Sequence, residues 1–264
     1  MSANRRQVLR GIGLTTAAAT LPVTAATADG DDGGETAGLR VAHASPDAPA
    51  VDVYVDGSKA VAGLAFGSVT DYLEVATGDR ELAVRVADTD TTVFGPVEVE
   101  LDAEDYTAVA RGEVSSDDTA FTVDLREDTN GANLDDGEAR VRAIHASPDA
   151  PAVDVTVDDG AVTLFEGVAF GESSGYAVVA ADEYEIEIRP AGGGDPVFET
   201  TATLASGSTY TAFAVGYLTP GDEPADEAFD LLLTEDATAP PRGDEGDDED
   251  DEDDNEDGGD GGED

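Results

Sequence analysis

The sequence predicts an all-β protein with two tandem immunoglobulin-like antiparallel β-sandwich domains and a disordered acidic tail. The first observation is a repeated phrase, because HASPDAPAVDV at 43–53 returns unchanged at 145–155. The second is a set of short segments in which apolar and polar residues alternate, the period of a strand with one face in water. The third is the lack of any long stretch with helical period. Because internal repeats set the architecture, the duplication is the starting point.

The duplication predicts a first domain at 39–125 and a second at 140–234. The connecting residues 126–139 are mostly Asp, Asn, Gly and Glu, which is typical of a linker. Each repeat is long enough to bury its own core without disulfides. Two domains joined by a short polar linker are therefore expected, and the sequence leaves open whether they pack together or swing apart. Further matches support the repeat: Ala65-Phe66-Gly67 with Ala169-Phe170-Gly171, and Tyr106-Thr107-Ala108 with Tyr210-Thr211-Ala212.

Each repeat contains seven short apolar segments separated by turn residues. Residues 51–56, for example, place valines on one face and polar side chains on the other. Seven such strands with regular turn signals favour a sandwich. The expected strands lie near 39–44, 51–56, 69–75, 81–87, 96–101, 106–111 and 120–125, and near 141–146, 153–158, 174–180, 184–189, 197–204, 210–216 and 228–233.

Two local features are expected to shape each domain. Pro46 and Pro49 stiffen the turn that joins the first two strands, because proline fixes its own φ and cannot donate to a ladder. Tyr106 occupies the place of a tyrosine corner, in which the hydroxyl bonds to backbone between two strands. An ordinary buried tyrosine is the alternative. The second repeat has the same residues at Pro148, Pro151 and Tyr210.

The only two histidines, His43 and His145, occupy the same place in each repeat. Both fall on the apolar face of their strand, so we expect structural imidazoles that bond to the proline-rich turn. Metal ligation and general-base catalysis are the alternatives, but one histidine per domain is too few for a zinc site. Ser45 and Ser147 lie outside any nucleophile elbow. No catalytic residue and no cofactor are predicted.

Asp47 and Asp52 are the candidate ligands for a hard cation such as calcium, which prefers oxygen donors. Their spacing matches no calcium-loop pattern. The alternative is simple solvation or a cross-strand pair of Arg40 with Asp52 or Asp56, if the first two strands are neighbours. Pairing or simple solvation is preferred to the cation site. The second repeat offers the same candidates at Asp149 and Asp154, with Arg142 in place of Arg40.

The charge balance predicts the solvent. The chain carries 61 acidic and 13 basic residues, a formal net charge of −48. Self-repulsion at that density opposes compaction, whereas near-molar salt shortens the Debye length to about 3 Å. A haloarchaeal, salt-adapted protein surrounded by solvent cations is therefore expected. Nucleic acid and anionic membranes are excluded as partners, because both repel such a surface.

The sequence predicts a targeting segment at the N-terminal end of the chain and a disordered tail at the C-terminal end. Residues 1–28 contain Asn4-Arg5-Arg6, followed by a modest apolar stretch and small residues at 26–28, which predicts a twin-arginine signal peptide. A transmembrane anchor is the alternative, but the stretch is weakly apolar and contains Pro22. No stable membrane anchor is expected after cleavage. Residues 235–264 are predicted to be a disordered acidic tail, with a divalent-cation sponge as the alternative.

The repeated phrase, followed by Asp56-Gly57, resembles the secreted family built on the domain of unknown function 4397. The second repeat departs slightly, because Asp158-Asp159-Gly160 adds a residue at that turn. The resemblance implies tandem sandwiches in an extracellular setting. It implies no activity that could be transferred to this chain.

The sequence as a whole predicts an exported, non-enzymatic cell-surface or secreted module with a structural, adhesive or ligand-binding role. An envelope protein or a glycan is the expected partner. The alternative is a secreted calcium-dependent carbohydrate binder or hydrolase that uses the His-Ala-Ser-Pro-Asp segment. Binding is expected in loops at the sandwich ends, which vary over a rigid scaffold. The candidate loops are 57–68, 88–95, 159–173, 190–196 and 217–227.

Overall fold

A computed structural model describes residues 34–130 and 133–238, which form sixteen β-strands and one 3₁₀ turn, η1 (Pro220–Asp222). The predicted signal peptide at 1–28 lies outside the described residues, as does the predicted tail beyond residue 238. The first repeat contains β1 (Thr36–His43), β2 (Val51–Val55), β3 (Ser58–Leu64), β4 (Leu73–Ala76), β5 (Gly78–Val86), β6 (Thr92–Leu101), β7 (Asp105–Arg111) and β8 (Thr122–Asp128). The second contains β9 (Glu138–His145), β10 (Val153–Val157), β11 (Val162–Val168), β12 (Ala177–Ala180), β13 (Glu183–Pro190), β14 (Phe198–Thr203), β15 (Ser208–Val215) and β16 (Asp230–Thr238).

Each repeat is a sandwich of two four-stranded sheets, which confirms the predicted fold class. The sheet orders are β4-β1-β7-β8 and β3-β2-β5-β6 in the first repeat, and β12-β9-β15-β16 and β11-β10-β13-β14 in the second. One pair in each repeat is parallel, β1 with β7 and β9 with β15, while the other pairs are antiparallel. Because β1 and β2 belong to different sheets, the proline-rich turn crosses the sandwich. β1 then pairs with β7 and not with the next strand along the chain.

One strand in each repeat falls in a segment predicted to be a loop. The segment 57–68 contains β3, and 159–173 contains β11. The turn before β3 has positive φ at both Asp56 (49°) and Gly57 (74°), the backbone of a tight two-residue hairpin. The loop prediction was therefore wrong for most of both segments.

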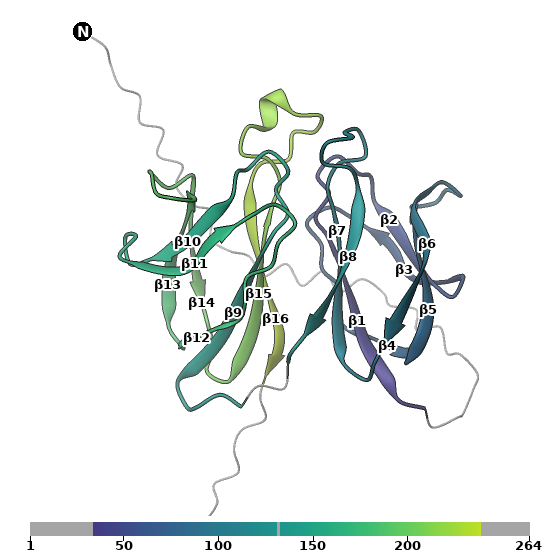
Figure 1. Cartoon of the computed structure of the whole chain (residues 1–264), viewed down its shortest axis with the longest axis horizontal. Coiled ribbons are helices and arrows are strands. Elements are labelled where there is room, and N and C mark those ends of the chain that lie inside the picture. The colour runs from purple at the N-terminus through teal and green to yellow at the C-terminus, as the bar shows by residue number, and fades with distance from the viewer. Residues whose placement is uncertain (1–33, 131–132, 239–264) are drawn as a thin grey trace, which may run out of the picture.

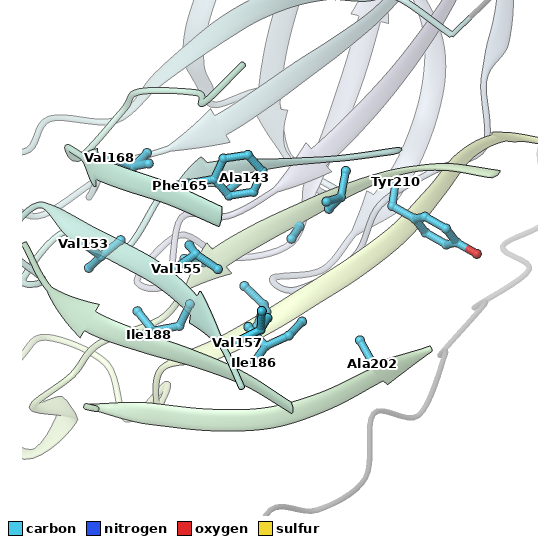
Figure 2. Packing of buried hydrophobic residues seen from close by; sticks show 14 of the residues in the cluster. Ala143, Val153, Val155, Val157, Phe165, Val168, Ile186, Ile188, Ala202 and Tyr210 are labelled. Carbon is cyan, nitrogen blue, oxygen red and sulfur yellow. The ribbon is translucent and has the colours of Figure 1, made fainter. Parts of the chain in front are cut away.

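Each sandwich has its own apolar core, built from the inward positions of both sheets. In the first repeat, Leu39, Val51 and Leu64 are all at most 1% exposed. Figure 2 shows the second core, where Val155 and Ile188 from one sheet lie near Ala143 of the other. The alternation in the sequence therefore separates inward from outward positions correctly along these strands.

A third apolar cluster lies between the two repeats. Ala42 and Val109, from the outer face of the β1–β7 sheet, pack with Ile144, Phe213 and Val215 from β9 and β15. Figure 1 shows these two sheets facing each other across the middle of the molecule. The two sandwiches therefore pack together through a buried face, a point that the sequence left open.

Candidate functional site

Both histidines of the repeated phrase are buried and bonded to backbone. His43 is 1% exposed, its Nδ1 accepts from Ser45 N–H at 3.4 Å, and its Nε2 lies 3.2 Å from the Pro49 carbonyl oxygen. Since Nδ1 accepts, Nε2 carries the proton and donates. His145 repeats the geometry at 3.3 and 3.0 Å. Each ring therefore closes the turn that follows its own strand.

Burial sets the charge state of these rings. Desolvation lowers the pKa of His43 and outweighs the Pro49 carbonyl, which raises it. The pKa of His145 is lowered for the same reason. A neutral imidazole with both nitrogens occupied fits a structural part of the turn.

The serine of the phrase ties the turn to a distant loop. Ser45 Oγ donates to the carbonyl of Gly112 at 2.6 Å, and Ser147 Oγ donates to that of Gly216 at 2.6 Å. Gly112 has φ +83°, and a Cβ there would lie 2.5 Å from the Ala120 carbonyl oxygen. The loop after β7 can therefore follow this path only with glycine at that point.

The first aspartate of the phrase continues the same connection. Asp47 accepts from the backbone N–H groups of Val114 and Ser115, at 2.8 and 3.0 Å, and from the Ser115 hydroxyl at 2.6 Å. Its counterpart Asp149 accepts from Leu218 N, Thr219 N and the Thr219 hydroxyl at 2.8 to 2.9 Å. These carboxylates hold the loops after β7 and β15.

The second aspartate holds a different element. Asp52 accepts from Gly63 N–H at 2.8 Å and pairs with Lys59 Nζ at 2.5 Å. Asp154 accepts from Gly167 N–H at 2.7 Å and Gly192 N–H at 3.1 Å. Each therefore fixes the irregular end of β3 or β11, not the loop that the first aspartate holds.

The candidate cation ligands consequently serve separate loops. Within residues 34–130 and 133–238, no three His, Asp or Glu side chains gather as a metal ion would require. We call the segments 43–52 and 145–154 the signature clasps, since their polar groups bind the turn, a neighbouring strand and a distant loop. The structure offers no support for a calcium site in them.

The remaining predicted motif residues lie at corners of the fold. Tyr106 Oη accepts from Asp102 N–H at 3.2 Å, and Tyr210 Oη accepts from Ala205 N–H at 3.0 Å. Each hydroxyl thus meets backbone a few residues upstream. Pro46 and Pro49 lie in the crossing turn, as do their counterparts Pro148 and Pro151.

The expected pairing of Arg40 with Asp52 or Asp56 is wrong. It requires β1 and β2 to be neighbours, and they lie in different sheets. Asp56 instead pairs with Arg80 at 3.1 Å. Arg40 is 1% exposed and points out of its sandwich toward the second repeat, where its Nη1 lies 2.7 Å from Asp236 Oδ1.

Arg40 belongs to a buried polar group that we call the interdomain network. Each repeat contributes an arginine, a threonine and an aspartate, and each arginine pairs with the aspartate of the other repeat. Arg40 thus reaches Asp236, while Arg142 pairs with Asp128. The threonines hold the aspartate of their own repeat, Thr107 to Asp128 at 2.5 Å and Thr211 to Asp236 at 2.6 Å.

Further bonds complete the interdomain network. Arg40 Nε donates to the Thr107 hydroxyl at 2.7 Å, and Arg142 Nε donates to that of Thr211 at 2.9 Å. Burial opposes the charge of Arg40, but Asp236 and other neighbours outweigh it and raise its pKa. Because each ion pair joins the two repeats, sliding one sandwich over the other would leave buried ions without their partners.

Sequence reasoning missed this network. Asp128 and Asp236 fell in the segments 126–139 and 235–264, predicted to be linker and tail, but Asp128 is the last residue of β8 and Asp236 lies within β16. The available signal was the matching position of Arg40 and Arg142, each four residues after the first residue of its strand and opposite Thr107 or Thr211 in the ladder. A polar outward face gives no indication of whether water or another domain covers it.

Three further contacts join the repeats. Tyr217, which is 0% exposed, donates to Glu113 Oε1 at 2.9 Å, and these residues occupy equivalent positions. Arg126 Nη2 donates to the Gly171 carbonyl at 2.5 Å, and the Arg111 guanidinium lies 5.0 Å from the centre of the Phe170 ring. The repeats therefore meet through the facing sheets and through the loops that contain Glu113, Tyr217 and Phe170.

None of the described residues forms a helix with the length and apolarity needed to cross a membrane.

The chain was compared with curated proteins and with solved structures. No curated protein gave a significant match. Two solved structures are similar, each described as a "putative cell adhesion protein". The one from Bacteroides eggerthii DSM 20697 has 13% identity and a TM-score of 0.23, covering 78% of this chain and 97% of that one. The one from Bacteroides uniformis ATCC 8492 has 8% identity and a TM-score of 0.21, covering 76% and 98%.

The family comparison covers both repeats. Residues 37–156 and 139–247 each match the family described as Domain of unknown function (DUF4397). These ranges contain both signature clasps and all sixteen strands except the first residue of β1. The chain therefore belongs to the DUF4397 family, in which it carries two tandem copies of the domain.

Proposed function

We propose that the protein is an exported, non-enzymatic surface or secreted module with an adhesive, structural or ligand-binding role in a haloarchaeal envelope. One observation carries the proposal: the side chains of the repeated phrase that could act in catalysis are hydrogen-bonded to the protein's own backbone. His43 and His145 are each 1% exposed and bonded through both nitrogens. The phrase therefore serves to stabilise the fold.

The rival use of the phrase, in hydrolysis or calcium-dependent carbohydrate binding, needs its groups to converge. A general base must reach the proton that it removes. His43 reaches only the turn, Asp47 reaches the loop at 114–115, and Asp52 reaches β3. The geometry therefore favours a scaffold role over a reaction centre.

The shared face between the sandwiches supports a mechanical role. A module that transmits force or presents binding loops at fixed spacing works best when its domains do not swing. The interdomain network and the cluster around Phe213 supply that rigidity. An envelope protein or glycan is the proposed partner, and the acidic surface argues against nucleic acid.

Export by the twin-arginine route is tested in a salt-requiring host. The full chain should appear in the envelope or medium fraction, whereas Arg5→Lys with Arg6→Lys should keep it in the cell. A cytoplasmic wild-type chain would overturn the proposed location. Purified protein is screened in parallel against ester, peptide and glycoside substrates, and a turnover that disappears in His43→Ala with His145→Ala would overturn the non-enzymatic assignment.

A further inference from the structure

The two repeats place an arginine at the same position on their outer sheet, but only one of them is satisfied. Arg189 lies opposite Asp154 in the ladder, as Arg85 lies opposite Asp52. In the second repeat, Arg189 Nη2 pairs with Glu187 Oε1 at 2.9 Å. Its Nη1 also donates to the Gly194 carbonyl at 2.6 Å. In the second repeat, the guanidinium at this position is thus paired with a carboxylate of the chain itself, that of Glu187.

The first repeat lacks that carboxylate. Ala83 occupies the position of Glu187, and Tyr54 occupies that of Thr156, opposite it in the ladder. The Arg85 guanidinium carbon lies 4.4 Å from the centre of the Tyr54 ring. Arg85 alone among the Lys and Arg side chains of residues 34–130 and 133–238 has neither an ion pair nor a side-chain hydrogen bond. Its Nε is buried without a partner. In a chain with 61 acidic residues, an unpaired arginine is unusual.

A second cation lies over the same aromatic ring. Lys59, the single lysine of the sequence, has its Nζ 5.8 Å from the centre of the Tyr54 ring. Its side chain is 41% exposed and contacts Asp52 at 2.5 Å. Tyr54, Lys59 and Arg85 therefore form one cationic and aromatic surface on β2, β3 and β5, which we call the Tyr54 patch.

We propose that the Tyr54 patch binds the carboxylate of an acidic saccharide. Arginine favours carboxylates through paired N–H donors, and the contact with the Tyr54 ring limits where the Arg85 guanidinium can lie. A saccharide fits better than an acidic peptide because Tyr54 and Arg85 lie on the central strands of the order β3-β2-β5-β6. Peptides that add to a sheet need unpaired edge backbone, which this face does not offer.

The net charge of the protein does not prevent this binding. At near-molar salt the Debye length is about 3 Å, so distant carboxylates on the surface no longer repel an anionic ligand. A carboxylate at hydrogen-bond distance from Arg85 is screened less than a fully exposed pair, because Arg85 is half-buried and its Nε is enclosed. The inference deepens the proposed function by naming a ligand class for it, and it rests on that function only for the extracellular setting in which such saccharides are met.

The test uses purified full-length protein in about 2 M KCl. Tetragalacturonate is titrated by calorimetry and by amide NMR, with its methyl ester as the uncharged probe. The acid should bind with shifts around Tyr54, and the ester should bind at least about tenfold more weakly, the factor expected for one charge-assisted contact. Arg85→Gln should lower affinity by a similar factor, whereas Arg189→Gln should not change it.

A second variant imports the arrangement of the second repeat. Tyr54→Thr with Ala83→Glu supplies an internal carboxylate to Arg85, so saccharide binding should disappear while the thermal unfolding midpoint shows that the chain is folded. Equal binding of acid and ester, unchanged binding by Arg85→Gln, or no binding by the folded wild type would overturn the proposal. Tighter binding of tetraglutamate than of tetragalacturonate would also overturn it, in favour of a peptide. A chain that binds the acid but stays in the cytoplasm would contradict the proposed function alone.

Discussion

Phe213→Ala is the substitution that tests most directly whether the two sandwiches form one unit. Phe213 is 0% exposed and lies in the cluster between the repeats, outside both sandwich cores. A phenylalanine buries roughly 150–250 Å², and at about 25 cal/mol per Å² this area corresponds to about 4–6 kcal/mol. Because unfolded chains already bury some of that area, we expect a loss of about 3–4 kcal/mol, within the range for such truncations.

The expected loss falls on the coupling between the domains. Guanidinium is unsuitable in high salt, so urea unfolding is followed with hydrogen exchange read separately in each repeat. The wild type should unfold in one transition. Phe213→Ala should lower the midpoint and separate the transitions, since each sandwich keeps its own core. Val178→Ala, at a site that is 54% exposed, is the matched control and should change stability by less than about 0.5 kcal/mol.

The reasoning would be refuted by a Phe213→Ala protein that unfolds at the wild-type midpoint in one transition. That result would mean that the shared face contributes no free energy. A variant that loses stability while both repeats still unfold together would contradict a narrower point, namely that the two sandwich cores are independent of the interface.

Three further predictions concern the clasps and the network. Burial holds the pKa of His43 and His145 below their unfolded value, so stability should be full above about pH 6.5 and fall as pH drops toward the folded pKa; replacing both by Gln should flatten urea midpoints measured between pH 7 and 5. Gly112→Ala should lower the free energy of unfolding by at least about 1 kcal/mol, because φ is +83° and backbone oxygen lies in the way; unaltered stability would exclude the crowding. Asp128→Ala should cost about 3 kcal/mol by leaving Arg142 buried and unpaired, and Arg142→Met in the same chain should recover much of it if the pairing is as described.

The sandwich architecture could be predicted because its inward positions are apolar and alternate strictly. Residues 51–55 show the pattern, with Val51 and Val53 buried in the core and Tyr54 on the other face. The strand β3 escaped prediction because its alternation is broken: Gly63 has φ +62°, and the ladder with β2 shifts register twice. The Asp56-Gly57 pair was the available hairpin signal.

The roles of the phrase could be predicted only in part. A histidine on an apolar face beside a proline-rich turn indicates a structural ring, and His43 lies where that reasoning puts it. The partners of Asp47 and Ser45 could not be predicted, since Val114 and Gly112 are far along the chain and approach only when β1 pairs with β7. The pairing of Arg40 could not be predicted either, because its partner Asp236 comes from the other repeat.

The placement of the basic residues follows from the charge of the chain. In concentrated salt, an exposed ion pair is screened and contributes little free energy. A pair that the protein encloses is screened far less, and removing one partner is costly. Arg40 and Arg142 are at most 3% exposed and join the two repeats, so these two ion pairs lie where salt screens them least.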